Sequence, residues 1–121
     1  MGTVENFKIE YIPIGKIKPN PRNAKKHPKE QIKNLAESLK EFKLCRPLGV
    51  RGEENQLVYG HGTLQALKAL EYKGTVPCVR LDYLTDEQCR AYALADNRTA
   101  ELGEWDDAIL GAELPILETL I

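Results

Sequence analysis

The stretch VYGHGTL, from Val58 to Leu64, restricts the fold of this chain more than any other. A short apolar run, Leu57–Tyr59, leads into two glycines, and leucines and alanines then recur at helical spacing over residues 64–70. The sequence therefore predicts a strand, a glycine-flanked turn and a helix. The first N–H groups of such a helix have no intrahelical partner and, with the helix dipole, form an anion site. A plain tight turn without a ligand would have the same sequence.

The composition is that of a globular domain with almost balanced charge. The 121 residues are 42% hydrophobic and 29% charged, with a net charge of -1, and we expect a single domain over residues 1–121. A protein that binds nucleic acid without regard to sequence would carry a large basic excess. One run is nevertheless basic, and it is either a solvated loop or a contact for nucleic acid: residues 16–29 hold Lys16, Lys18, Arg22, Lys25, Lys26 and Lys29.

The sequence gives no expectation of a membrane or a metal framework. No stretch is long and apolar enough to span a bilayer, and residues 1–9 lack the apolar core of a signal peptide. The cysteines, Cys45, Cys78 and Cys89, are widely spaced without a C-x-x-C motif, which fits a reducing cytoplasm and buried thiols. Since His27 and His61 are the chain's two histidines, a structural zinc site is not expected.

The first part of the chain predicts a strand and a stiff loop. Residues 7–14, FKIEYIPI, alternate apolar and polar side chains, as in a strand that ends at Pro13. Two prolines in the next segment, residues 17–23, keep the backbone extended and exclude a helix. This loop can therefore present three polar side chains at a fixed place: Asn20, Arg22 and Asn23.

The middle of the chain predicts a helix, a hairpin and a second helix. Apolar residues recur at helical spacing over residues 28–43, with a proline at the first position. Residues 44–50 and 57–59 form strands on either side of a polar turn at residues 52–55. The second helix is expected over residues 63–72, with its end near Lys73-Gly74.

The last part predicts a strand and two helices. The strand covers residues 76–81, and a capping box of Thr85 and Gln88 then begins a helix that ends near residues 96–98. Gly103 separates this helix from a last one, which Pro115 should interrupt. The whole order predicts a small α+β domain with a mixed sheet. The abrupt apolar end of the chain suggests a domain cut from a longer protein.

Five segments in this order resemble the ParB/sulfiredoxin-like domain. They are I-x-P-N-P-R-N, L-x-x-S-L-K-E-F, R-P-L-x-V, G-H-G and L-T-D-E-Q…A-L-A-D-N-R, and the likeness runs from about Ile9 to Trp105. The subgroup it most resembles, the ParB-like nucleases, occurs alone in phages and mobile elements or is fused ahead of DNA N6-adenine or N4-cytosine methyltransferases. In that subgroup W-D follows D-N-R, as Trp105-Asp106 follows residues 96–98 here.

The resemblance implies a nucleotide site at the turn before the second helix. In this superfamily a G-x-x-R box holds phosphates there; ParB binds and hydrolyses CTP with it, and sulfiredoxin uses ATP with a catalytic cysteine in the box. The implied ligand is CTP, ATP or ADP, with Asp96 or Asn97 facing a Mg²⁺ ion. Carried onto this chain, the site residues are Asn20, Arg22, Asn23, Arg46, Pro47, Gly60, His61, Gly62, Thr63, Asp96, Asn97 and Arg98.

Two positions of the box depart from the family pattern. Position 61 is His rather than Cys, and sulfiredoxin chemistry requires a thiolate, so that activity is not expected. Position 63 is Thr where the box has Arg, and an Arg fork grips phosphate with two bonds while a hydroxyl offers one. Arg22 or Arg98 would have to supply the missing charge.

The sequence leaves three functions open. The first, which the resemblance favours, is a nucleotide-binding domain that supports DNA modification or segregation, attached to or partnering a DNA methyltransferase and pairing as a homodimer. The second is a phosphohydrolase, kinase or nuclease in the same pocket, with His61 as general base. The third is a module that binds the DNA backbone through residues 16–29 without any nucleotide.

Overall fold

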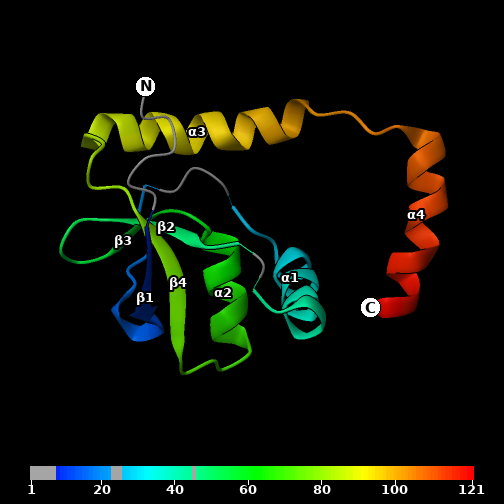
Figure 1. The fold of residues 1–121 in the computed structure, drawn as a ribbon, viewed down its shortest axis with the longest axis horizontal. Helices are drawn as coiled ribbons and strands as arrows, with labels where there is room; N and C mark the ends of the chain where they lie inside the picture. Colours follow the sequence, from blue (N-terminus) through cyan, green and yellow to red (C-terminus); the bar gives the residue numbers. More distant parts are fainter. Residues whose placement is uncertain (1–7, 23–25, 45) are drawn as a thin grey trace.

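The computed structural model describes residues 8–22, 26–44 and 46–121, so that Phe7, Asn23, Lys25 and Cys45 lie outside the described residues. The predicted α+β class with a mixed sheet is confirmed (Figure 1). In chain order the elements are β1 (Ile9–Pro13), a 3-10 turn (Ile14–Lys16), α1 (Lys29–Phe42), β2 (Leu48–Arg51), β3 (Gln56–Tyr59), α2 (His61–Ala69), β4 (Thr75–Arg80), α3 (Asp86–Leu102) and α4 (Asp107–Leu120).

The four strands form one sheet in the order β1-β4-β2-β3. The central strands β4 and β2 are parallel, with Leu48 opposite Cys78, and α2 lies between β3 and β4 in the chain. The edge strands β1 and β3 pair antiparallel with β4 and β2. The β2–β3 register shifts between Gly49 and Val50, which makes a bulge next to the end of β3.

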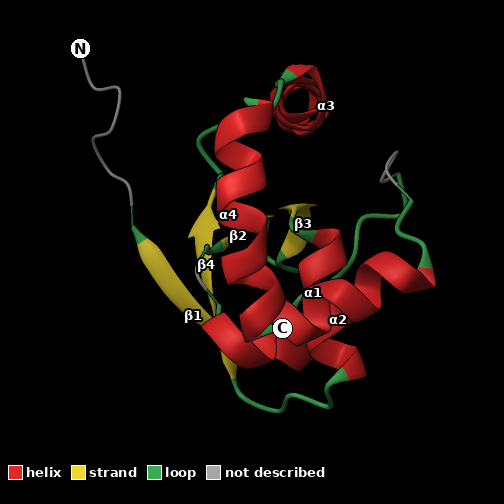
Figure 2. Cartoon of the chain, turned by 90° about the vertical axis from the view of Figure 1, so that its right-hand side faces the viewer, coloured by secondary structure: helices red, strands yellow, loops and turns green. Residues whose placement is uncertain are grey.

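Helices cover the sheet in two groups. Leu64 and Leu67 of α2 pack with buried residues of the sheet such as Val50, and α1 packs beside α2. Cys89 of α3 packs with a second buried cluster that includes Val58 and Val79. Figure 1 and Figure 2 both place α3 across one end of the sheet, above α1 and α2. The N-terminal end of α2 therefore lies on the side of the sheet that α3 covers.

Arg80 at the end of β4 holds the β2–β3 hairpin to the sheet. Its Nε donates to Glu10 Oε2 at 2.6 Å, its Nη1 to the Gly52 carbonyl at 2.9 Å, and its Nη2 to Asn55 Oδ1 at 2.6 Å. Asp82 Oδ1 also accepts the N–H of Gly52 at 3.0 Å. One half-buried guanidinium thus joins β1, β4 and the polar turn that the sequence predicted at residues 52–55.

The second helix begins and ends earlier than predicted. It starts at His61, two positions before the predicted start, so residues 61–63 form its first turn. At its other end Glu71 adopts a positive φ of 58°, and the N–H of Tyr72 donates to the Leu67 carbonyl at 3.1 Å. This Schellman-type end closes the helix before the predicted stop at Gly74, because a non-glycine residue takes the left-handed position.

The last two helices correct two further predictions. The capping box of Thr85 and Gln88 is confirmed, but α3 continues to Leu102, so residues 96–98 lie inside the helix rather than at its end. The prediction that Pro115 interrupts the last helix is wrong, because α4 runs from Asp107 to Leu120 with Pro115 inside it. No helix in the described part of the chain is both long and apolar enough to cross a membrane.

Candidate functional site

The N-terminus of α2 presents backbone donors without a cap. Gly60 adopts the left-handed conformation with φ 97°, and the first intrahelical bond runs from the Leu64 N–H to its carbonyl at 2.9 Å. The N–H groups of His61, Gly62 and Thr63 precede that bond, and no described side chain caps them. These donors and the positive end of the helix dipole therefore point at the same space, which suits an anion.

Both glycines of the box are required by close neighbours. A side chain at Gly60 would place its Cβ 2.8 Å from Leu48 Cγ, in addition to the strain of the positive φ. At Gly62 a Cβ would lie 3.0 Å from the His27 ring and 3.0 Å from Leu35 Cδ1. The box is thus a tight cradle whose backbone is open only because these two side chains are missing.

A hollow of about 290 Å³, which we call the helix hollow, opens at this cradle. Its other walls come from the segment before α1, from α1, from β2 and from β3: His27, Gln31, Leu35, Leu48, Val58 and Tyr59. It brings together eight residues that the sequence analysis assigned to a nucleotide site: Arg46, Pro47, Gly60, His61, Gly62, Thr63, Asp96 and Asn97.

A second hollow of about 170 Å³, which we call the loop hollow, lies beside the first. The early loop contributes Asn20 and Arg22 to it, and α3 contributes Asp86 and Arg90. The two hollows share three residues that separate them: Val58, His61 and Asn97. Asn20 and Arg22 of the early loop therefore border the loop hollow and not the helix hollow, while Asn23 lies outside the described residues.

The early loop is fixed to the edge of β3. Lys18 forms a one-residue parallel bridge with Gln56, and its carbonyl accepts the N–H of Leu57 at 2.8 Å. Beyond this bridge the N–H of Asn20 donates to Nε2 of His61 at 3.1 Å, and Asn20 Oδ1 accepts the N–H of Arg22 at 2.9 Å. The two prolines and these bonds together hold the loop against the first turn of α2.

His61 is buried, with 8% of its surface exposed, and its ring is held neutral. Burial lowers the pKa of His61, and the nearby His27 lowers it further. Because Nε2 accepts a hydrogen bond from the backbone of Asn20, the proton of the neutral ring is on Nδ1. Both ring nitrogens of His61 are thus committed to fixed roles in this structure.

The charges near the cradle come from few side chains. Arg46 and Asp96 are the charged residues of the helix hollow, among the residues that the structure describes. Arg22 lies in the loop hollow, with Nη1 3.9 Å from Asp86 Oδ2. Arg98 borders neither hollow and pairs with Glu101 on the exposed side of α3 at 3.8 Å. The two arginines expected to replace the charge missing at position 63 therefore lie elsewhere.

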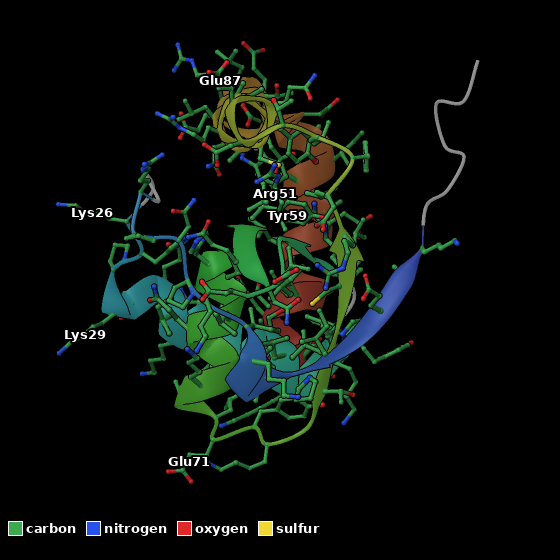
Figure 3. All side chains as sticks on the ribbon, turned by 90° about the vertical axis from the view of Figure 1, so that its left-hand side faces the viewer. Lys26, Lys29, Arg51, Tyr59, Glu71 and Glu87 are labelled. Carbon is green, nitrogen blue, oxygen red and sulfur yellow. The ribbon has the colours of Figure 1, made fainter. Side chains whose placement is uncertain are left out.

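An aromatic pair stands at the α3 side of the helix hollow. The rings of Tyr59 and Tyr92 meet edge to face with their centroids 5.9 Å apart. Burial raises the pKa of Tyr59, as do Tyr92 and Asp96, while Arg46 lowers it. The Tyr59 ring covers the space above Gly49, where an added Cβ would collide with the ring. Figure 3 labels Tyr59 below α3.

The described thiols do not belong to the cradle. Cys78 is fully buried, and burial raises its pKa to about 11. Cys89 borders the loop hollow, and burial also raises its pKa. A raised pKa keeps both thiols protonated and weakly nucleophilic at neutral pH. Neither of these thiols borders the helix hollow, and position 61 of the cradle is histidine.

Several site residues were not found from the sequence. His27, Gln31 and Tyr59 border the helix hollow, and Arg51 and Arg90 border the loop hollow. The five motif segments assigned none of these residues to the site. His27 was noted only as one of the chain's two histidines, in a basic run. Tyr59 directly precedes Gly60 in the chain, whereas the others come near the cradle through long-range packing that no local pattern encodes.

The sequence matches the ParB N-terminal domain family over residues 2–98. This match covers most of the chain, and the strand–glycine turn–helix cradle lies within it. The chain therefore belongs to the ParB N-terminal domain family.

One curated protein and two solved structures are similar to this chain. The chain is 37% identical over 84 residues to the ParB-like nuclease domain-containing protein YnaK of Escherichia coli (strain K12), covering 69% of this chain and 94% of that protein. C-terminally truncated chromosome-partitioning protein ParB from Caulobacter crescentus, complexed with CTP-gamma-S, matches with a TM-score of 0.70 at 21% identity over 82% of this chain. Sulfiredoxin from Arabidopsis thaliana matches with a TM-score of 0.56 at 21% identity, over 72% of this chain and 97% of that one. This chain spans only 56% of the Caulobacter chain.

Proposed function

We propose that this domain binds the phosphates of a nucleotide, CTP, ATP or ADP, on the first turn of α2. The observation that carries the proposal is the uncapped N-terminus of α2, whose N–H donors at residues 61–63 open into the helix hollow. The glycines of the cradle let phosphate oxygens approach the backbone closely. Membership of the ParB N-terminal family and the Caulobacter ParB structure with CTP-gamma-S support this choice of ligand.

Mg²⁺ belongs to the proposal as a companion of the phosphates. Asp96 and Asn97 of α3 border the helix hollow opposite the cradle and carry the hard oxygen ligands that Mg²⁺ prefers. Within residues 8–22, 26–44 and 46–121 no three His, Cys, Asp or Glu side chains gather as a metal site. This fits an ion that takes one carboxylate from the protein and its other ligands from phosphate and water.

Hydrolysis at this site, by a phosphohydrolase or a nuclease, is the less favoured alternative. A general base needs a free lone pair within reach of the attacking water. The Nε2 lone pair of His61 already accepts the N–H of Asn20, and Nδ1 carries the ring proton. We therefore assign His61 a positioning role, in which it joins the early loop to the cradle and keeps the two hollows apart.

A role in DNA modification or segregation is the second part of the proposal. The segment 96–98 followed by Trp105-Asp106 supports attachment to, or partnership with, a DNA methyltransferase, with this chain as the N-terminal part of a longer protein. The Caulobacter relative is a chromosome-partitioning protein, which supports a role near DNA in segregation. Lys26 and Lys29 project away from the body of the domain in Figure 3, so direct backbone contact by the basic run belongs to the same proposal.

Pairing of two copies also belongs to the proposal. The last helix, α4, stands apart from the sheet in Figure 1 and has no buried residue. Its apolar side chains are exposed, among them Ile109, Leu114, Ile116, Leu117 and Leu120. Light scattering with and without nucleotide measures the pairing directly.

The proposed function is tested by the melting temperature of the domain with CTP, ATP, ADP and GTP, with and without Mg²⁺. A ligand that binds only the folded state increases the free energy of unfolding, by about 2.7 kcal/mol at a ligand concentration of one hundred times Kd. The melting temperature rises as a result. We expect a rise with at least one nucleotide, and a further rise with Mg²⁺. No rise with any of the four at millimolar concentration would refute the proposal.

The Mg²⁺ assignment has its own variant pair. We expect Asp96→Asn to lose the rise that depends on Mg²⁺ and to keep the rise seen without it, because only the ion needs the carboxylate. The control is Glu87→Gln, which removes a carboxylate from the outer side of the same helix (Figure 3). Equal Mg²⁺ effects in both variants would contradict the role of Asp96.

A further inference from the structure

The helix hollow has less positive charge than a phosphate site of this kind needs. Arg46 is the fixed cation among its described residues, and Asp96 opposes it. Thr63 offers a hydroxyl where an arginine would offer a charged fork. Arg22 is on the other side of His61, and Arg98 faces solvent beside Glu101. Another side chain at the cradle must therefore supply positive charge if di- or triphosphate is to bind tightly.

His27 is that side chain by position. Its ring borders the helix hollow and packs directly on the first turn of α2, since a Cβ at Gly62 would lie 3.0 Å from both its Cε1 and its Nδ1. The Nδ1 of His27 lies 2.9 Å from Oε1 of Gln31, which fixes the ring against α1. The absence of a side chain at Gly62 is what lets the imidazole approach the N–H donors of the cradle.

The bond to Gln31 determines which ring nitrogen of His27 can take up a proton. Since Gln31 presents its carbonyl oxygen, Nδ1 of His27 is the donor and the neutral ring has its lone pair on Nε2. Uptake of a proton at Nε2 adds one positive charge and turns that nitrogen from an acceptor into a donor. An acceptor repels a phosphate oxygen and a charged donor attracts it, so one proton reverses the sign of the contact.

We propose that His27 is a phosphate-binding residue of this domain and that its protonated ring supplies the charge that Thr63 lacks. This inference rests on the proposed function and names the condition under which the cradle binds most tightly. Histidine is the side chain whose charge changes between pH 5 and 8. Affinity for phosphate groups therefore rises as the pH falls through this range.

The groups around His27 support this assignment. On its own segment Lys26, Lys29 and Glu30 are exposed. From α2 it faces His61, whose lowered pKa and committed Nε2 exclude it as the group that titrates with the ligand. From the segment before β2 and from α3 the hollow presents Arg46 and Asp96, which oppose each other in charge. His27 is thus the side chain of the hollow, among described residues, that combines contact with the first turn of α2 and an imidazole that the early loop does not hold.

The test is the affinity of the whole domain for ADP and for inorganic pyrophosphate between pH 5.5 and 8, measured by calorimetry. Both probes take up protons themselves in this range, so the informative quantity is the ratio of affinities between wild type and variant at each pH. For His27→Gln we expect a ratio near one at pH 8 and on the order of tenfold at pH 5.5. His27→Lys, with a permanent charge, should bind on the order of tenfold more tightly than wild type at pH 8 and about equally at pH 5.5.

Two further measurements show whether His27 contacts the phosphate or only packs against α2. Lys26→Gln removes a neighbouring exposed charge, and its ratio to wild type should stay constant with pH. The His27 ring resonances should titrate at higher pH when ADP is bound, because the anion favours the protonated ring. A flat ratio for His27→Gln would overturn the role of His27 and leave nucleotide binding intact. Absence of binding at every pH would overturn the proposed function as well.

Discussion

Replacing Gly62 with aspartate is expected to remove nucleotide binding, with a loss of at least about a hundredfold in affinity, or about 2.7 kcal/mol. The new carboxylate would stand among the N–H donors of residues 61–63, where the phosphate has to lie. It would repel the phosphate and could accept those N–H groups itself, as an aspartate does at the start of a helix. It would also press on His27 and Leu35, each 3.0 Å from the new Cβ.

Two matched variants divide this effect into its parts. Gly62→Ala adds the same Cβ without the charge, so it measures the steric contribution alone. Gln65→Asp places the same charge on an exposed position of the same helix, away from both hollows, so it measures the long-range electrostatic contribution. Titration calorimetry should rank the affinities as wild type close to Gln65→Asp, then Gly62→Ala, then Gly62→Asp. If Gly62→Asp binds as tightly as Gln65→Asp, the phosphate does not lie on this turn.

The second large effect concerns stability. Gly60→Ala should lower the free energy of unfolding by roughly 2–4 kcal/mol, since a left-handed φ costs an alanine about 1–2 kcal/mol and a crowded core contact costs about as much again. The φ of Gly60 is 97°, and the added Cβ would meet Leu48 Cγ at 2.8 Å. Leu48 is 2% exposed and cannot move without disturbing the core.

Gly52 provides the control for Gly60. It also has a positive φ, of 82°, but nothing lies within 4 Å of a Cβ added there. Gly52→Ala should therefore cost only the backbone strain, about 1 kcal/mol. Urea unfolding of both variants gives the comparison through the midpoint and the slope. Equal losses in the two variants would mean that the contact with Leu48 has no energetic weight.

The sequence was sufficient for those elements that local patterns encode. The capping box of Thr85 and Gln88 determines the start of α3 by two reciprocal bonds between neighbours, and both bonds are present. The polar turn at residues 52–55 and the strand–turn–helix at Gly60 were also predicted, because neighbouring residues in the sequence encode both. The length of α3 was not predicted, because its second half is held by no buried apolar stripe that periodicity could reveal.

The arrangement of the site was predictable only in part. The resemblance identified residues on the cradle and on α3, and the structure brings eight of them to one hollow. It could not show that Arg22 borders the loop hollow and not the helix hollow, because the place of the early loop depends on contacts such as the Asn20–His61 bond, across 41 positions of the chain. His27 was missed because its place on Gly62 results from the packing of α1 on α2, which carries no local signal.

The central claim is that phosphate binds on the first turn of α2. The most direct test is the shift of backbone amide resonances as the ¹⁵N-labelled domain is titrated with CTP, ATP, ADP and GTP in the presence of Mg²⁺. We predict saturable shifts that are largest at His61, Gly62 and Thr63 and are accompanied by Asn97 of the same hollow. Amides of residues 61–63 that stay unchanged at millimolar nucleotide, or shifts confined to other parts of the sheet, would contradict the claim.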